Sequence, residues 1–338
     1  MRFRSPLWTM ILAGLVVAAS PALGALPIGL SVDLTLVHEG ETRTYDVLRP
    51  GSAAGLQPHV LVVDLHGFTS NGDQQRSISG WQAIAQTEGI LVAWPDGLDN
   101  SWNAGTCCGA SVTNDVDDVG FIRAMVAAIQ AEVNVDPGRI YVTGLSNGGA
   151  MTQRLACEAA DLFAAAAPMA FPVPYTNFAA QCLPSESIPI LSFMGLTDVL
   201  VSYAGAAPSF AAWRDKNGCD SGGTPVETTE THGGSSCAID TSCSEAGLEV
   251  GLCSVTGSAF GPPLDIFSGH ILYINDDSFD ISQRAWEFMR DYRRTPFAPV
   301  PLSGTAWVLA VALAGMGALM LKSHRSRSVG STGDPFDR

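Results

Sequence analysis

Gly144-Leu145-Ser146-Asn147-Gly148 is the stretch of this chain that decides its fold. An apolar run at 139–143 precedes it, and a helix-forming segment at 149–156 follows it. A Gly-x-Ser-x-Gly motif between a strand and a helix predicts a nucleophile elbow, a tight turn that presents a serine hydroxyl at the edge of a sheet. Glycines flank the serine because side chains there would clash, and the helix N-terminus favours developing negative charge. Ser146 is therefore the candidate nucleophile.

Short apolar runs alternate with helical segments on both sides of this motif. Continuous apolar runs predict strands buried on both faces, at 59–65, 90–94, 141–144, 163–170 and 188–194. Apolar residues at helical spacing predict helices at 81–86, 119–133, 209–216 and 282–292, with Asp117 or Asp118 and then Asp280 as N-caps. Alternating residues predict an antiparallel hairpin over 31–37 and 42–48. This order predicts an α/β fold, a mostly parallel sheet with helices on both faces.

The composition allows a large core and opposes a role in nucleic-acid binding. The 338 residues are 46% hydrophobic and 15% charged, which suffices for one large α/β domain or two smaller ones. The net charge is −15, and phosphate binding needs a basic face that the sequence does not offer. We interpret the acidity as a well-solvated surface and expect no nucleic-acid partner.

The N-terminus has the pattern of an export signal. Arg2 and Arg4 precede a short apolar core at 7–19, and small residues at 22–24 offer a cleavage site before Ala25. We predict a signal peptide at 1–24, the alternative being an uncleaved N-terminal anchor. An even count of eight cysteines in an exported chain predicts disulfides, and no CxxC pair has the spacing of a zinc site.

The C-terminus carries a second targeting feature. An almost wholly apolar segment at 302–321 is followed at once by four basic residues, Lys322, His324, Arg325 and Arg327. This pattern predicts a transmembrane helix at 302–321 and a basic cytoplasmic tail at 322–338, which leaves the domain at 28–296 outside the cytoplasm. A buried core helix is the alternative.

The same segment resembles the sorting tails of exosortase-processed bacterial proteins. Val300-Pro301-Leu302-Ser303 is similar to the VPLPA type of motif but departs from it at the last two positions. The resemblance implies exosortase-type processing, and a plain stop-transfer anchor fits equally well.

One region breaks the alternation of strands and helices. Residues 218–261 are rich in Gly, Ser, Thr and Glu and contain four of the cysteines. We expect a disulfide-pinned excursion around one strand at 248–255. It is either a decorated surface loop or an element that controls substrate access.

A serine nucleophile needs a base within hydrogen-bond reach and an acid that fixes the tautomer of that base. In this architecture they follow in the order Ser, Asp or Glu, His. Of the six histidines only His232 and His270 follow Ser146 within the domain, and His270 is favoured because it lies between the last strand and the final helix. Asp198 follows the strand at 190–195, at the strand end where open α/β sheets build their sites.

Two backbone N–H groups are needed to stabilise the oxyanion. We expect one from Asn147, directly after the nucleophile, and one from Phe68, in the loop after the strand at 59–65. Gly67 would allow the backbone to approach the substrate, and His66 is interpreted as a structural support of this loop. This chemistry needs no metal and no organic cofactor.

With these residues placed, the chain resembles the esterases grouped around polyhydroxybutyrate depolymerases and feruloyl or acetylxylan esterases, which have the α/β-hydrolase fold. The resemblance covers about 50–296 and is carried by these segments: His66-Gly67-Phe68, Trp94-Pro95-Asp96-Gly97, Trp102-Asn103-Ala104-Gly105, Cys107-Cys108-Gly109, 117–122, 144–149, 195–198 and Gly269-His270. It implies a triad of Ser146, Asp198 and His270, with oxyanion amides from Phe68 and Asn147.

The chain departs from the family around the histidine. Gly269-His270 is followed by Ile271-Leu272-Tyr273, where the family usually has a glycine run with a tryptophan and a proline, and the tryptophan that often shapes the acyl pocket is absent. Trp102 is the candidate for a pocket wall, with simple packing as the alternative.

The resemblance also implies a disulfide arrangement. Cys107 and Cys108 would separate, each bonding to one of Cys157 and Cys182. The four other cysteines, Cys219, Cys237, Cys243 and Cys253, would then pair among themselves.

Together these features predict an extracytoplasmic serine carboxylic-ester hydrolase, tethered to the membrane by its C-terminal helix or released after processing. Its substrate would be a feruloyl, acetyl or short-chain hydroxyalkanoate ester, small or polymeric. The alternatives are a serine peptidase of the same fold and a non-catalytic surface-binding protein on a hydrolase scaffold. An intracellular polymer-granule hydrolase is disfavoured by the export signal and the cysteines.

Overall fold

A computed structural model describes residues 26–55, 57–219 and 230–295. The chain divides into two units, 1–294 and 295–338, and almost all described residues belong to the first. The predicted signal peptide, C-terminal apolar segment, VPLPA-like motif and basic tail all lie outside the described residues. Within the described residues, no helix has the length and apolar character needed to cross a bilayer.

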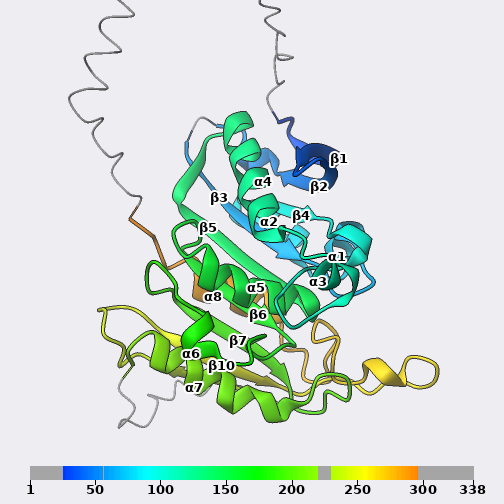
Figure 1. The fold of residues 1–338 in the computed structure, drawn as a ribbon, viewed down its shortest axis with the longest axis vertical. Coiled ribbons are helices and arrows are strands. Elements are labelled where there is room, and N and C mark those ends of the chain that lie inside the picture. The colour runs from blue at the N-terminus through cyan, green and yellow to red at the C-terminus, as the bar shows by residue number, and fades with distance from the viewer. Residues whose placement is uncertain (1–25, 56, 220–229, 296–338) are drawn as a thin grey trace, which may run out of the picture. The chain divides into compact units, whose positions relative to one another are not determined.

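Ten strands of the described residues form one mixed sheet (Figure 1). Their bounds are β1 (Gly29–His38), β2 (Glu41–Arg49), β3 (His59–Leu65), β4 (Leu91–Pro95), β5 (Val135–Leu145), β6 (Ala165–Met169), β7 (Ile190–Gly195), β8 (Glu230–His232), β9 (Ser235–Asp240) and β10 (Val250–Val255). Their order is β1-β2-β4-β3-β5-β6-β7-β10-β9-β8, in which the six strands from β4 to β10 pair in parallel. The carboxyl ends of β3, β5 and β7 therefore meet at one edge of the sheet.

Helices cover both faces of the sheet (Figure 1). Their bounds are α1 (Gly72–Ile78), α2 (Trp81–Glu88), α3 (Gly109–Thr113), α4 (Asp118–Glu132), α5 (Asn147–Glu158), α6 (Phe178–Gln181), α7 (Ala206–Lys216) and α8 (Ile281–Met289). Apolar side chains of α4, α5 and α7 join the core on one face, and those of α2 and α8 join the core on the other. The central strands are buried along their whole length and are mostly apolar, as expected where both faces of a sheet are covered.

The N-terminal edge of the sheet is the antiparallel hairpin of β1 and β2. Its outer strand exposes apolar side chains, among them Leu30, Val32 and Val37.

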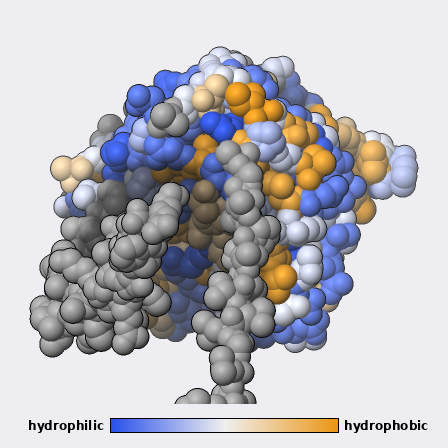
Figure 2. Space-filling view, turned by 90° about the horizontal axis from the view of Figure 1, so that it is seen from above, coloured by the Kyte–Doolittle hydropathy of each residue, from blue (hydrophilic) through white to orange (hydrophobic). Residues whose placement is uncertain are grey.

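Figure 2 views the molecule from above and shows hydrophobic patches set in a largely hydrophilic surface. Such a surface agrees with the acidic composition of the chain.

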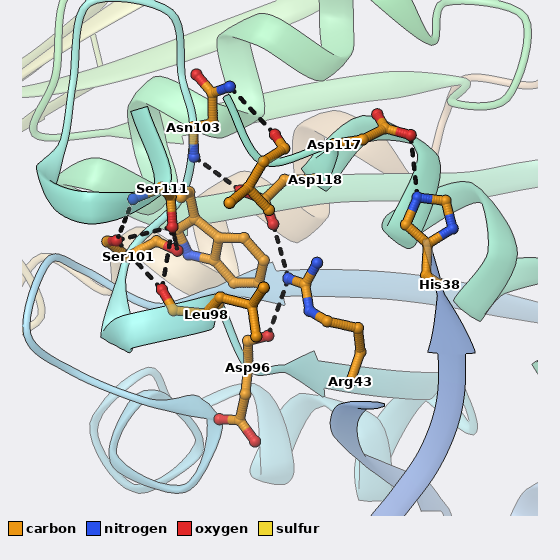
Figure 3. A network of polar contacts seen from close by, with 12 residues as sticks. His38, Arg43, Asp96, Leu98, Ser101, Asn103, Ser111, Asp117 and Asp118 are labelled. Atoms are coloured by element: carbon orange, nitrogen blue, oxygen red, sulfur yellow. Dashed lines mark hydrogen bonds and ion pairs between the residues drawn. The ribbon is translucent and has the colours of Figure 1, made fainter. Parts of the chain in front are cut away.

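A buried ion pair ties this edge to the helical layer (Figure 3). The Arg43 guanidinium of β2 lies 2.7 Å from the carboxylate of Asp118 at the start of α4, and it lies 3.8 Å from the ring centroid of Phe121. The other oxygen of Asp118 accepts the backbone N–H of Asn103 at 2.7 Å. The loop after β4 is therefore anchored to both β2 and α4.

Most of the strands and helices expected from the sequence are present within a few residues, including the hairpin of β1 and β2, the N-cap of α4 at Asp117 and that of α8 at Asp280. The region 218–261 differs from the expectation of a single strand. Besides β10 it holds β9 and β8, which extend the sheet by antiparallel pairing. β8 is three polar residues long and β9 is half polar, so their sequences do not distinguish them from loops.

The predicted pairing of four of the cysteines is wrong. Cys157 bonds to Cys182, and the adjacent Cys107 and Cys108 bond to each other. The physical reason is proximity: Cys157, near the end of α5, and Cys182, after α6, are buried in the same core. The prediction that the four remaining cysteines pair among themselves is confirmed, with bonds Cys219–Cys243 and Cys237–Cys253.

Candidate active site

Ser146 lies in the sharp turn between β5 and α5. Its backbone has φ of 59° and ψ of −120°, a conformation that an L-residue adopts only under constraint from its surroundings. The constraint includes a hydrogen bond of 2.9 Å from its N–H to the Met169 carbonyl. A side chain at Gly148 would collide with the backbone oxygens of Leu65 and His66, so glycine is required where α5 passes the loop after β3.

His270 and Asp198 form a buried hydrogen-bonded pair. The Nδ1 of His270 lies 2.7 Å from Oδ2 of Asp198, and both side chains are almost fully buried. The other oxygen of Asp198 accepts the backbone N–H groups of Leu200 and Val201, each at 2.8 Å. Since the carboxylate is an acceptor, His270 donates through Nδ1, which leaves its Nε2 as the acceptor in the neutral ring.

The loops that carry this pair touch backbone to backbone. Gly269 has φ of +70°, and a side chain there would collide with the backbone of Thr197 and Asp198. A side chain at Gly195 would in turn collide with the carbonyl oxygen of Gly269. Glycine at both positions therefore allows the loops after β7 and β10 to bring acid and histidine together.

One cavity joins Ser146 to His270. It has a volume of about 560 Å³, and both residues line it. Among the described residues, Nε2 of His270 is buried without a hydrogen-bond partner. The other walls are mostly apolar and include Phe68, Ile78, Leu145, Leu200, Phe267 and Ile271. The cavity can therefore hold an apolar group beside the side chains of Ser146 and His270.

Phe68 lies on the cavity wall, in the loop expected to supply an oxyanion amide. A side chain at Gly67 would lie 3.4 Å from Cβ of Ser146, so this loop runs directly past the serine. The Nδ1 of His66 lies 2.8 Å from the Gly67 carbonyl oxygen. Because the peptide group is planar, holding this carbonyl also fixes the direction of the Phe68 N–H.

His66 supports this loop and does not face the cavity. Its Nε2 accepts the Gly97 N–H at 2.9 Å, so the ring proton is on Nδ1, which donates to the Gly67 carbonyl. Burial lowers the pKa of His66 to about 4, which keeps the ring neutral above that pH.

Trp102 is not at the cavity wall. Its side chain is fully buried, and its ring packs against His66 and Phe121, with centroid distances of 4.8 and 6.5 Å. Its backbone N–H and carbonyl both bond to the side chain of Asn147. The structure therefore places Trp102 behind the loop of Phe68, where it packs and donates hydrogen bonds, and not in contact with the cavity.

The sequence did not predict one buried acidic group near the site. Asp64, at the end of β3, accepts hydrogen bonds from Gln75 at 2.7 Å and Trp94 at 2.9 Å. Burial raises its pKa to about 7. Gln75 also lines the cavity and donates to the hydroxyl of the partly buried Tyr273 at 2.9 Å. In the sequence, the indication of this buried acidic group is a single Asp inside the apolar run 59–65.

Other polar clusters of the described residues lie apart from this cavity. A second cavity, of about 550 Å³, is lined by five aspartates and holds no described Ser, His or Cys side chain, so it contains no serine–histidine pair. Two groups have the spacing of metal ligands. One is Cys219, Asp240 and Cys243, whose cysteines are joined in a disulfide. The other is His38, Glu39 and Asp117, in which His38 pairs with Asp117 (Figure 3).

The sheet order, the elbow between β5 and α5 and the helices on both faces define the α/β-hydrolase fold. A match to the Prolyl oligopeptidase family covers residues 104–181. Two solved structures with 17% sequence identity share the fold over 78% of the chain. They are the acetyl xylan esterase from Aspergillus awamori, with a TM-score of 0.58 over 99% of that chain, and a thermostable esterase, with 0.53 over 63%.

The chain is homologous to proteins named as esterases and polyester depolymerases. It is 33% identical to feruloyl esterase B of Piromyces equi over 228 residues, which are 62% of this chain and 40% of that protein. It is 36% identical to poly(3-hydroxyalkanoate) depolymerase C of Paucimonas lemoignei over 32% of this chain and 27% of that protein. Feruloyl esterase C of Emericella nidulans is 26% identical over 74% of this chain and 90% of that protein.

The chain spans less than half the length of the first four curated relatives that it matches. The resemblance expected from the sequence agrees with the names of these relatives, and the expected fold is confirmed by the sheet and the structural neighbours.

Proposed function

We propose that this protein is a serine carboxylic-ester hydrolase that acts through an acyl-enzyme. One observation carries the proposal: Ser146 and His270 line the same cavity, and His270 is bonded through Nδ1 to the buried Asp198. The names of the homologous esterases support the same reaction class.

In the proposed mechanism, Nε2 of His270 removes the proton of the Ser146 hydroxyl as the oxygen attacks the ester carbonyl. The backbone N–H groups of Phe68 and Asn147 stabilise the oxyanion, and Asp198 stabilises the imidazolium. Collapse of the intermediate breaks the ester bond, and His270 gives its proton to the leaving alcohol. A water molecule, deprotonated by His270, then attacks the acyl-enzyme and releases the acid and the free serine.

The apolar walls of the cavity support an ester whose acyl group has hydrocarbon character. Feruloyl, acetyl and short-chain hydroxyalkanoate esters remain the substrates we propose, since relatives are named for each of them. Methyl ferulate, acetylated xylan and hydroxybutyrate oligomers, compared at equal ester concentration, would rank the three classes by kcat/KM.

Replacement of the nucleophile tests the reaction class. Ser146→Ala should abolish hydrolysis of p-nitrophenyl butyrate and labelling by a fluorophosphonate, whose adduct in the unaltered protein should map to Ser146. Ser187→Ala is the control, because Ser187 donates to Glu245 at 2.8 Å and does not line the cavity, so its loss should leave the activity unchanged. Full activity of Ser146→Ala, or an adduct on another residue, overturns the proposal.

A serine peptidase is the second candidate, and the match to the Prolyl oligopeptidase family favours it. The same residues would then cleave an amide bond. Hydrolysis of p-nitroanilide peptides at a kcat/KM above that for p-nitrophenyl esters would make the peptidase the better assignment. Absence of fluorophosphonate labelling would instead favour a non-catalytic surface-binding protein.

We further propose that the protein acts outside the cytoplasm. The signal-like segment at 1–24 and four disulfides among the described residues support this location. The apolar segment at 302–321 with its basic flank supports a membrane tether, or a sorting tail that is later removed. The N-terminal sequence and intact mass of the protein from fractionated cells test both, with cleavage expected before Ala25.

A further inference from the structure

The side chain of Asn147 is engaged with the backbone of Trp102 through both of its polar atoms. Its Oδ1 accepts the Trp102 N–H at 2.7 Å, and its Nδ2 donates to the Trp102 carbonyl at 3.0 Å. The side chain of Asn147 is fully buried. Its side chain therefore fixes the loop after β4 against the N-terminus of α5.

The side chain of Trp102 continues this connection to the loop after β3. Its indole Nε1 donates to the His66 carbonyl at 2.9 Å, and its ring packs on the His66 imidazole. His66 in turn holds the Gly67 carbonyl at 2.8 Å. That carbonyl belongs to the same planar peptide as the Phe68 N–H. An unbroken series of buried hydrogen bonds thus links the side chain of Asn147 to the peptide of Phe68.

We propose that Asn147 and Trp102 are positioning residues that set the spacing of the two oxyanion donors. This rests on the proposed function, because the donors are the N–H groups of Phe68 and Asn147. They belong to separate elements, the loop after β3 and the start of α5, and no covalent geometry holds them at a fixed separation. The bridge through Trp102 supplies that constraint, and oxyanion stabilisation depends on donors held in place before reaction.

Trp102→Phe tests the bridge because it keeps a buried aromatic ring and the backbone groups that Asn147 needs, while it removes the indole N–H together with part of the ring volume. We expect kcat on p-nitrophenyl butyrate to fall by about 10-fold or more with KM within about twofold, since displaced donors weaken binding of the transition state more than of the ground state. Trp213→Phe is the matched control. It also removes one buried indole hydrogen bond, at 2.7 Å to Gln153, but at a site outside the bridge, and its kcat should not change.

Asn147→Ala removes the other end of the bridge. This variant should also lower kcat at constant KM. It should bind a boronic acid that mimics the tetrahedral intermediate more weakly, while its affinity for the product acid stays the same. Because both variants break one bridge, the loss in Trp102→Phe/Asn147→Ala should be smaller than the product of the single losses.

An unchanged kcat in Trp102→Phe, or losses that multiply in the double variant, overturns the proposal. A rise in KM with unchanged kcat also overturns it. An equal fall of kcat in Trp213→Phe does so too, because it would indicate a general packing effect. Failure of the proposed function looks different, since the unaltered protein would then lack Ser146-dependent esterase activity from the start.

Discussion

The imidazole of His270 and the carboxylate of Asp198 lie 2.7 Å apart in a nearly water-free position, although 72 residues separate them in the chain. Two backbone N–H groups hold the second oxygen of that carboxylate. The acid is therefore fixed on both sides, and it can orient only one ring nitrogen of its partner. In the neutral ring, Nε2 is thereby left without a proton and can accept one.

Asp198→Asn should destroy this orientation while keeping the size of the side chain. An amide can donate to the imidazole and so favour the tautomer that carries its proton on Nε2, which cannot accept the serine proton. We expect kcat on p-nitrophenyl butyrate to fall by about 10³–10⁴-fold at pH 7. Asp265→Asn, an exposed change in the loop before His270, is the control. Activity within tenfold of the unaltered enzyme would contradict the role assigned to Asp198.

Arg43→Met should destabilise the fold by about 3–5 kcal/mol, because it leaves the buried Asp118 carboxylate without its cation. Arg43→Met/Asp118→Asn should recover part of that loss. Burial already raises the pKa of Asp118 and Arg43 opposes the shift, so removal of Arg43 should raise it further. The cost should then be larger at pH 8 than at pH 5, as measured by urea denaturation with the disulfides intact. A cost that does not depend on pH would argue against an uncompensated carboxylate.

Asp64 should make the fold less stable as the pH rises. Its pKa is about 7 in the folded protein, above the ordinary aspartate value of about 3.9, so the folded state holds the proton that the unfolded chain has released. The contribution is complete below about pH 4 and is lost as the pH rises towards and through 7. Asp64→Asn keeps an acceptor for Trp94 and removes the titration. The difference in Tm between variant and unaltered protein should therefore increase from pH 5 to pH 8, and a constant difference would refute the assignment.

Peptide mapping without reduction should recover a peptide pair linked through Cys157 and Cys182. It should also recover a single peptide whose mass shows an internal bond between Cys107 and Cys108. Cys157→Ser/Cys182→Ser should lower the stability by about 2–4 kcal/mol, since the bond closes a loop with a sequence separation of 25. Cys219→Ser/Cys243→Ser is a comparison with nearly the same separation, 24. A linked peptide that joins Cys107 or Cys108 to Cys157 or Cys182 would contradict the arrangement.

Local signals account for what the sequence predicted well. The elbow at Ser146 combines an apolar strand, two glycines and a helix start, and the strands β3, β6 and β7 are apolar runs that only a doubly covered sheet can bury. Chain order then restricts the acid and the base to a few positions, and the structure brings Asp198 and His270 together.

What the sequence did not predict depends on contacts between distant segments. Trp102 looks the same in a sequence whether it faces a cavity or packs behind a loop, and its burial follows from His66 and Phe121 on other elements. Disulfide partners are set by which helices share a core, as for Cys157 and Cys182. The raised pKa of Asp64 likewise comes from tertiary burial, which a single polar residue in an apolar run does not reveal.

The order of strands in the sheet has a consequence for the growing chain. Everything up to β7 and the loop that follows it can form before the ribosome has made β10, and that portion already contains Ser146, Phe68 and Asp198. His270 is made last, after the disulfide-bonded region that precedes it. On the proposed mechanism a nascent chain is inert toward esters until its final quarter has been synthesised and docked, so a newly made molecule gains hydrolytic power only at the end of its own assembly.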